Sequence, residues 1–86
     1  MLQDFTALDL ETTGLNPKTD KIIEIGAVRI RDGKEAARWE SLVNPGCQIS
    51  NFTEELTGIR NEELMSAPAI EEVLPALMDF LMDDVL

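Results

Sequence analysis

The stretch from Thr6 to Leu15 restricts the possible folds of this chain more than any other part of its sequence. Residues 5–10 are a short, mostly apolar run that ends at Thr12-Thr13-Gly14, a pattern typical of a β-strand followed by a turn. Side chains alternate between the two faces of a strand, so Asp9 and Glu11 are predicted to point the same way. Their Cα atoms would lie about 6.5–7 Å apart.

Two carboxylates this close repel each other, and an apolar neighbourhood makes it harder to charge both. The pair becomes favourable when hard divalent cations lie between the carboxylates, because Mg²⁺ and Mn²⁺ prefer oxygen ligands. Two such ions about 3.5–4 Å apart are the usual arrangement for phosphoryl transfer. The alternative is that Asp9 and Glu11 are solvated charges at the end of an exposed strand, and these residues alone leave both interpretations open.

Two further strands are predicted after the first. Residues 21–31 are rich in Ile and Val, and residues 34–43 alternate in part. Asp32-Gly33 between them predicts a type I′ hairpin turn, which needs positive φ at both positions. The three strands together predict an antiparallel meander, in which Trp39 packs against the hairpin rather than stacking on nucleic-acid bases.

Short helices are predicted next. Asn51 and Glu54 have the spacing of a capping box, so a helix over residues 52–56 should begin there and stop at Gly58. Asn61 is predicted to cap a further helical turn.

The last helix is predicted to open at Ser66-Ala67-Pro68, with Pro68 in the first turn. Pro75 lies inside the pattern and should kink the helix or delay its start. The helix should end near residues 83–84, and residues 85–86 resemble the start of another strand. Its apolar face is predicted to comprise Ile70, Val73, Leu74, Leu77, Phe80 and Leu81.

The charge balance limits the partners of this chain. Seventeen acidic residues against seven basic ones give a net charge of −10, which is unusual for a protein that binds a phosphate backbone. Six of the cations fall between residues 18 and 38. They favour a solvated hairpin surface over a strip that contacts phosphates. Bound metal ions would reduce the need for basic side chains, because they supply positive charge locally.

Cys47 is the only cysteine, so no internal disulfide can form, and without any His it has no catalytic base. No apolar run is long enough to span a membrane and no signal peptide is visible, so we expect a cytoplasmic protein that contacts no membrane.

The residues Asp9-Leu10-Glu11-Thr12-Thr13-Gly14-Leu15 resemble the first motif of the DEDD superfamily of 3′→5′ exonucleases. The nearest branch is the family of the proofreading (epsilon) subunit of bacterial DNA polymerase III. The likeness continues, in order, through residues 22–28, 43–45, 56–59, 67–68, 80–81 and 85–86. The resemblance implies an α/β, ribonuclease H-like fold. Residues 1–86 would be the N-terminal part of a single exonuclease domain, with a three-stranded antiparallel meander, short helices and one longer helix.

The resemblance also implies roles for individual residues. Asp9 and Glu11 would be the catalytic ligands of Mg²⁺ or Mn²⁺, and as part of the family's two-metal site they are expected to bind these ions weakly. Glu24 occupies a position where an acidic strand residue is common in this family, and it is not counted as a ligand. Side chains or backbone near the substrate would come from Thr12, Thr13, Leu15, Leu56, Thr57 and Ile59.

Four of these residues also have a purely structural interpretation. Leu56 and Ile59 could pack in the core, and Thr12 and Thr13 could form hydrogen bonds within the turn.

The implied activity is two-metal hydrolysis of nucleic-acid 3′ ends to nucleoside 5′-monophosphates. Single-stranded or frayed DNA is favoured over RNA as the substrate. The family takes two more acidic ligands and a His or Tyr base from later motifs. The sequence contains no His and no Tyr, so we expect this chain alone to be inactive.

Two other interpretations compete with the exonuclease. In the resembling fold the first strand lies in the middle of the sheet, so stopping at residue 86 would leave it as an open edge. A non-catalytic acidic module could pair through that edge with a polymerase or with a second copy. An unrelated small metal-binding fold is a weaker alternative, since it treats the later matches as chance.

Overall fold

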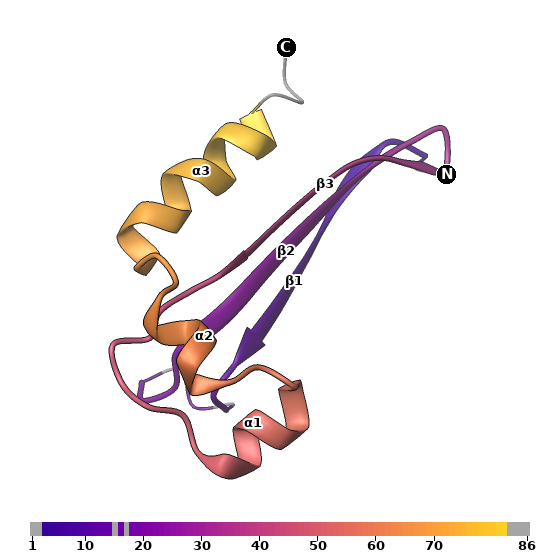
Figure 1. Cartoon of the computed structure of the whole chain (residues 1–86). Helices are drawn as coiled ribbons and strands as arrows, with labels where there is room; N and C mark the ends of the chain where they lie inside the picture. The colour runs from indigo at the N-terminus through magenta and orange to yellow at the C-terminus, as the bar shows by residue number, and fades with distance from the viewer. Residues whose placement is uncertain (1–2, 15, 17, 83–86) are drawn as a thin grey trace.

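The structure is a computed structural model that describes residues 3–14, 16 and 18–82. A single antiparallel sheet in the order β1-β2-β3 is followed by three helices (Figure 1). The elements are β1 (Phe5–Thr12), β2 (Ile22–Arg31), β3 (Lys34–Leu42), α1 (Asn51–Thr57), α2 (Asn61–Met65) and α3 (Ile70–Met82). The predicted meander of three strands is therefore confirmed. The expected helix end at residues 83–84 and the strand at 85–86 lie outside the described residues.

The turn between β2 and β3 has the backbone that the sequence predicts. Asp32 and Gly33 have φ values of 52° and 75°, the positive pair that a type I′ turn requires. At the other end of the sheet, β1 runs two residues farther than predicted. Glu11 pairs with Glu24 and Thr12 pairs with Ile22, with a register shift between the two pairs.

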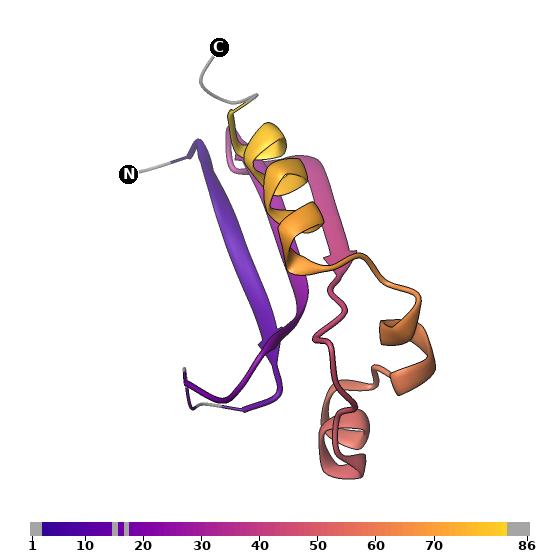
Figure 2. The ribbon, with the colours of Figure 1, turned by 90° about the vertical axis from the view of Figure 1, so that its left-hand side faces the viewer.

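The main core lies between α3 and one face of the sheet. Ile25 and Ala27 of β2 are buried together with Val73 and Leu77 of α3. Figure 2 shows α3 lying over β2 and β3, while β1 lies at the side of the sheet that α3 leaves uncovered. The predicted apolar face of the helix is confirmed except at Leu74, which stays exposed because no described element covers that side of α3.

The side chains of Trp39 and Arg29 add contacts between α3 and the sheet. Trp39 packs against the main core, as predicted for a hairpin residue. Arg29 of β2 donates a hydrogen bond to the backbone carbonyl of Phe80 in the last turn of α3. Its guanidinium also lies 4.3 Å from the centre of the Phe80 ring. A cation near a helix C-terminus is favourable, because the last carbonyls lack partners within the helix.

The start of α3 corrects one prediction. The carbonyl of Ala69 accepts hydrogen bonds from the N–H groups of Glu72 and Val73, at 2.9 and 3.1 Å, so the helix begins at Ile70. Pro68 therefore precedes the helix instead of lying in its first turn. There its carbonyl accepts a hydrogen bond from the N–H of Asn44 at 2.8 Å. Pro75 remains inside the helix.

The cap of α1 differs from the prediction. Ser50 is the N-cap, and its Oγ accepts the N–H of Thr53 at 3.1 Å. Asn51 is the first helical residue instead of the cap. Glu54 cannot close the predicted capping box because its carboxylate accepts the N–H of Asn61 at 2.8 Å. The predicted stop at Gly58 is confirmed by its φ of 77°.

The cap of α2 also moves by one residue. Arg60 precedes the helix, and its N–H donates to Glu63 Oε1 at 3.1 Å. Asn61 does not cap the helix, because its side chain bridges the backbone of Ile49. It accepts the N–H at 2.8 Å and donates to the carbonyl at 3.1 Å. A second core cluster forms here from Ile23, Ile49, Ile59 and Leu64.

α1 lies beyond the end of the sheet at which β1 finishes, and α2 lies beside that end (Figure 1). The turn after β1 and α1 therefore lie at the same end of the molecule. Within the described part of the chain, no helix has the length and apolar character needed to cross a membrane.

Candidate active site

Asp9 and Glu11 project from the face of the sheet opposite α3. Leu8 pairs with Ala27 and Leu10 pairs with Ile25, and both β2 residues are buried in the α3 core. Directly opposed residues in an antiparallel pair point to the same face. The leucines therefore lie on the α3 side, and the alternating carboxylates lie on the other side. The predicted shared orientation of the two carboxylates is confirmed.

The same face carries a carboxylate that the sequence analysis left out of the site. Glu24 lies directly opposite Glu11 in the β1–β2 pairing, and Gly26 lies opposite Asp9. Asp9, Glu11 and Glu24 all line one hollow of about 260 Å³. Ala7 and Gly26 also line it, and their small size leaves room between the charged side chains.

The hollow has a strongly negative environment. Burial is the largest cause that raises the pKa of Glu24 above its ordinary value, and the charge of Glu40 is the second. The charges of Glu11, Asp9 and Glu63 raise the pKa of Glu24 further. Each of these carboxylates therefore makes ionisation of Glu24 harder, and a cation in the hollow would make it easier.

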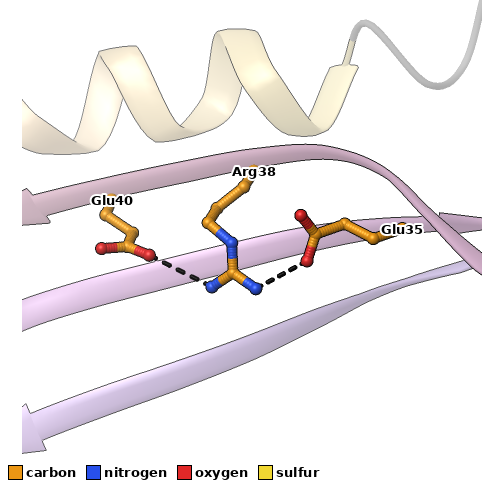
Figure 3. Close-up of polar contacts among 3 residues, drawn as sticks. All are labelled: Glu35, Arg38 and Glu40. Carbon is orange, nitrogen blue, oxygen red and sulfur yellow. Dashed lines mark hydrogen bonds and ion pairs between the residues drawn. The ribbon is translucent and has the colours of Figure 1, made fainter.

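Arg38 of β3 also lines the hollow, but two carboxylates hold it. Its guanidinium lies 2.6 Å from Glu35 and 3.1 Å from Glu40 (Figure 3). These hydrogen bonds raise the pKa of Arg38, with that to Glu35 the larger cause. Glu35 pairs with Ile30 and Arg38 pairs with Val28, so a register shift in the β2–β3 pairing brings Glu35 and Arg38 to one face.

The turn after β1 is built around Asp20. Its Oδ1 accepts the hydroxyl of Thr13 at 2.8 Å, and its Oδ2 accepts the N–H of Asn16 at 2.8 Å. The Thr12 hydroxyl donates to the carbonyl of Gly14 at 2.7 Å. A Cβ at Gly14 would lie only 2.7 Å from Asp20 Oδ2, so a larger residue would displace the Asp20 carboxylate that holds this turn. Both threonine hydroxyls therefore serve the turn.

The predicted substrate-contact residues after β3 separate into two groups. Leu56 on α1 is 73% exposed, whereas Ile59 is 7% exposed and belongs to the second core cluster. Thr57 donates its hydroxyl to the carbonyl of Thr53 at 2.8 Å. Leu56 is thus available for contact with a ligand, and Ile59 supports the packing below α1. Leu15 lies outside the described residues.

The donor set of the hollow suits a hard divalent cation. Asp9 and Glu11 offer only oxygen atoms, which Mg²⁺ and Mn²⁺ prefer. Among the described residues, no three acidic, Cys or His side chains are close enough together to hold a metal ion by themselves. The residues therefore fit a site in which Asp9 and Glu11 supply part of the coordination.

The sequence predicts the face on which Glu24 lies, but it does not predict the partner of Glu24 across the sheet. Glu24 alternates with the apolar residues Ile23 and Ile25, which places it on the face away from the core. Its position opposite Glu11 could not be predicted, because residues 13–21 form a long connection that does not set a register.

The chain matches known proteins over nearly all of its length. The RNase T family model, described as exonuclease, matches residues 6–86. A DNA polymerase III PolC-type protein of Thermotoga petrophila is 46% identical over 82 residues, which are 95% of this chain and 6% of that protein. The DNA polymerase III subunit epsilon of Aquifex aeolicus is 38% identical over 81 residues, which are 94% of this chain and 40% of that protein. The chain thus spans less than half the length of either relative.

Solved structures of exonucleases also resemble this chain. The nuclease domain of 3′hExo, described as a DEDDh family member bound to rAMP, has a TM-score of 0.85 and 25% identity, covering 98% of this chain and 46% of that chain. Exonuclease X, solved in complex with 5′ overhanging duplex DNA, has a TM-score of 0.72 and 32% identity, covering 84% of this chain and 42% of that chain. These likenesses confirm the predicted ribonuclease H-like fold.

Proposed function

This chain belongs to the exonuclease family, and we propose that Asp9 and Glu11 are its catalytic, metal-binding carboxylates for hydrolysis at nucleic-acid 3′ ends. The resemblance to DEDD exonucleases and to the epsilon branch is confirmed by the family match and the relatives. The observation that carries the proposal is that both carboxylates share the open face of β1, next to the Thr-Thr-Gly turn. Residues 1–86 would form the N-terminal part of one exonuclease domain.

In this proposal the carboxylates bind the metal ions, and the backbone of the turn after β1 positions the substrate. Asp9 and Glu11 bind Mg²⁺ or Mn²⁺. When bound, these ions would activate water for attack and stabilise charge on the leaving 3′-oxygen, which releases a nucleoside 5′-monophosphate. The backbone at Thr12 and Thr13 positions the terminal sugar, because the turn already uses both hydroxyls.

The contact to the last bases comes from the loop and helix at the same end of the molecule. Leu56 and Thr57 on α1, together with Leu15, would form an apolar clamp around them. Ile59 is buried in the second core cluster, so it would support this clamp from below by fixing the residues that follow α1.

The substrate we propose is a single-stranded or frayed 3′ end of DNA, with RNA second. Two relatives are named as DNA polymerase III proteins, and Exonuclease X was solved with DNA, whereas the 3′hExo domain was solved with rAMP. A polymerase is accordingly the partner that we propose. The 86 residues contain no His and no Tyr, so they supply neither kind of general base. We therefore expect this chain alone to leave 3′ ends intact.

Cation-dependent binding of DNA tests this proposal without requiring turnover. The measurement is the fluorescence anisotropy of a 5′-labelled single-stranded oligonucleotide with Mn²⁺ or with EDTA. We expect Mn²⁺ to strengthen binding to the wild-type chain. In Asp9→Asn and Glu11→Gln this gain should fall by at least about tenfold, because losing a direct ligand costs more than losing an outer partner.

Glu72→Gln provides the matched control, because it removes one negative charge on α3, on the other side of the sheet. It should keep the full gain from Mn²⁺. If Mn²⁺ brings no gain in binding, or if Asp9→Asn retains it, the proposed site is wrong. If the chain shortens the labelled strand and Asp9→Asn does not, the expected inactivity of the chain alone is wrong.

A second candidate function is favoured by one observation on the opposite face of β1. Leu8 and Leu10 are 56% and 50% exposed, and β1 is an edge strand among the described residues. A non-catalytic module that pairs through this edge would use the same strand without needing a metal. The cation-dependent binding described above separates the two functions, because edge pairing does not depend on Asp9.

A further inference from the structure

We propose that Glu24 is a positioning residue of the divalent-cation site: a carboxylate that lies beside Glu11 and accepts hydrogen bonds from the hydration water of the ion, without ligating the ion. This inference rests on the proposed function of Asp9 and Glu11. It adds Glu24 to that site as a third residue from the two strands. Glu24 belongs neither to the motif of residues 9–15 nor to the turn that follows β1.

The strand register places Glu24 closer to the ligands than any other carboxylate of the hollow. Glu24 and Glu11 are direct partners across β1 and β2. Such partners have Cα atoms about 4.5–5.5 Å apart and point to the same face. Glu40 also lines the hollow, but it pairs with Gly26, which in turn pairs with Asp9. It therefore lies two strand spacings from β1, about 9–10 Å.

The Glu11–Glu24 pair is unfavourable without a cation. Like charges directly opposite each other destabilise a sheet. The described residues show no hydrogen bond or ion pair that would neutralise Glu24, and the nearby guanidinium of Arg38 is shared between Glu35 and Glu40. A divalent cation in the hollow would offset this repulsion.

An outer position agrees with the geometry better than direct ligation. No three acidic, Cys or His groups of the described residues converge closely enough to hold an ion. Mg²⁺ usually keeps several waters in protein sites. A neighbouring carboxylate can accept hydrogen bonds from those waters and so hold them in position around the ion. Glu24 is placed to do this beside Glu11.

Titration with Mn²⁺, followed by electron paramagnetic resonance of the free ion, tests the inference. We expect Glu24→Gln to weaken Mn²⁺ binding about tenfold, within the 10–100-fold range typical of outer partners of a metal site. Glu40→Gln is the matched control. It removes the same charge from the same hollow, one strand farther away, and its amide oxygen can still accept from Arg38. Its affinity should stay within about threefold of the wild-type value, below the range for outer partners.

The spectrum of bound Mn²⁺ at saturation gives a second readout. It reports the symmetry of the oxygen atoms around the ion, which a change in fold stability alone does not alter. The spectrum should change in Glu24→Gln and stay the same in Glu40→Gln, and circular dichroism should show both variants folded.

Three results would separate the possible failures. Equal losses of affinity in the two variants would mean that only the total charge of the hollow matters. Wild-type affinity in Glu24→Gln would remove any role for Glu24. Wild-type Mn²⁺ affinity in Asp9→Asn would instead overturn the proposed function itself, whatever Glu24 does.

Discussion

Glu24 carries its charge opposite Glu11, and its pKa is raised first by burial and then by the charges of Glu40, Glu11 and Asp9. A carboxyl group with a higher pKa in the folded state than in the unfolded state binds protons more strongly when folded. Its ionisation therefore costs stability. The cost is absent well below the ordinary value of 4.5, grows as the pH rises from that value, and is complete above the folded-state pKa.

Glu24→Gln should therefore stabilise the fold at neutral pH. Because Gln resembles the protonated acid, we expect the melting temperature to rise by about 1–3 °C near pH 7, less than the 4–8 °C expected for a full 1 kcal/mol in a domain of this size. Near pH 3.5 the two proteins should melt together. Thermal unfolding followed by circular dichroism at both pH values, without divalent metal, is the measurement. A lower melting temperature for Glu24→Gln near pH 7 would contradict the assigned cause of the shift.

Among the elements, α3 contains the one position where local sequence opposes the structure most directly. Pro75 lies inside this helix and is exposed to solvent. The helix begins at Ile70, so Pro75 lies beyond the first turn, where the N–H of another residue would bond to the carbonyl of Glu71. The packing of Val73 and Leu77 against the sheet keeps the helix continuous despite the missing bond.

Pro75→Ala should therefore raise stability by about 1–2 kcal/mol, part of the roughly 3 kcal/mol by which Ala exceeds Pro inside a helix. Urea unfolding gives the free energy directly. Pro68→Ala is the control, since Pro68 precedes α3 and contributes its carbonyl, which the substitution keeps. It should change stability by less than about 0.5 kcal/mol. A loss of stability in Pro75→Ala would mean that the core requires the helix shape that Pro75 imposes.

The elements also show where sequence reasoning succeeds and where it stops. Asp32-Gly33 and Gly58 were predictable because each position needs a positive φ that few residues adopt. The caps of α1 and α2 were each misplaced by one residue, because their side chains have distant partners: Glu54 binds Asn61, and Asn61 binds Ile49. Local spacing does not contain those contacts.

In the candidate site, too, some features follow from the local sequence and others depend on contacts between distant residues. The shared face of Asp9 and Glu11 follows from strand alternation alone. The position of Glu24 opposite Glu11 depends on the β1–β2 register, and the burial of Ile59 depends on its packing with Ile23, Ile49 and Leu64 in the second core cluster. Both arise from tertiary packing that a motif does not describe.

At the scale of the whole molecule, the two edges that the sheet has among the described residues differ in how they are protected. Charged side chains line β3, among them Lys34, Glu35 and Arg38, and a register shift interrupts its pairing with β2. Such features discourage edge-to-edge association. The β1 edge has no such interruption over residues 5–11, and Leu8 lies exposed on its apolar face. The net charge of −10 is then the main opposition to self-association through β1.

Association should therefore increase with salt, because ions screen the repulsion between chains: the screening length falls from about 10 Å at 0.1 M to about 3 Å at 1 M. Sedimentation equilibrium at several salt concentrations measures it. Leu8→Lys should keep the chain monomeric at high salt, since it places a charge on the apolar face of the edge. Leu56→Lys is the control: it makes the same change in charge at an exposed leucine of α1, and it should associate like the wild type. If both variants remain monomeric, the added charge is the cause and the β1 edge is not the contact. If both variants associate like the wild type, the chains associate through another surface.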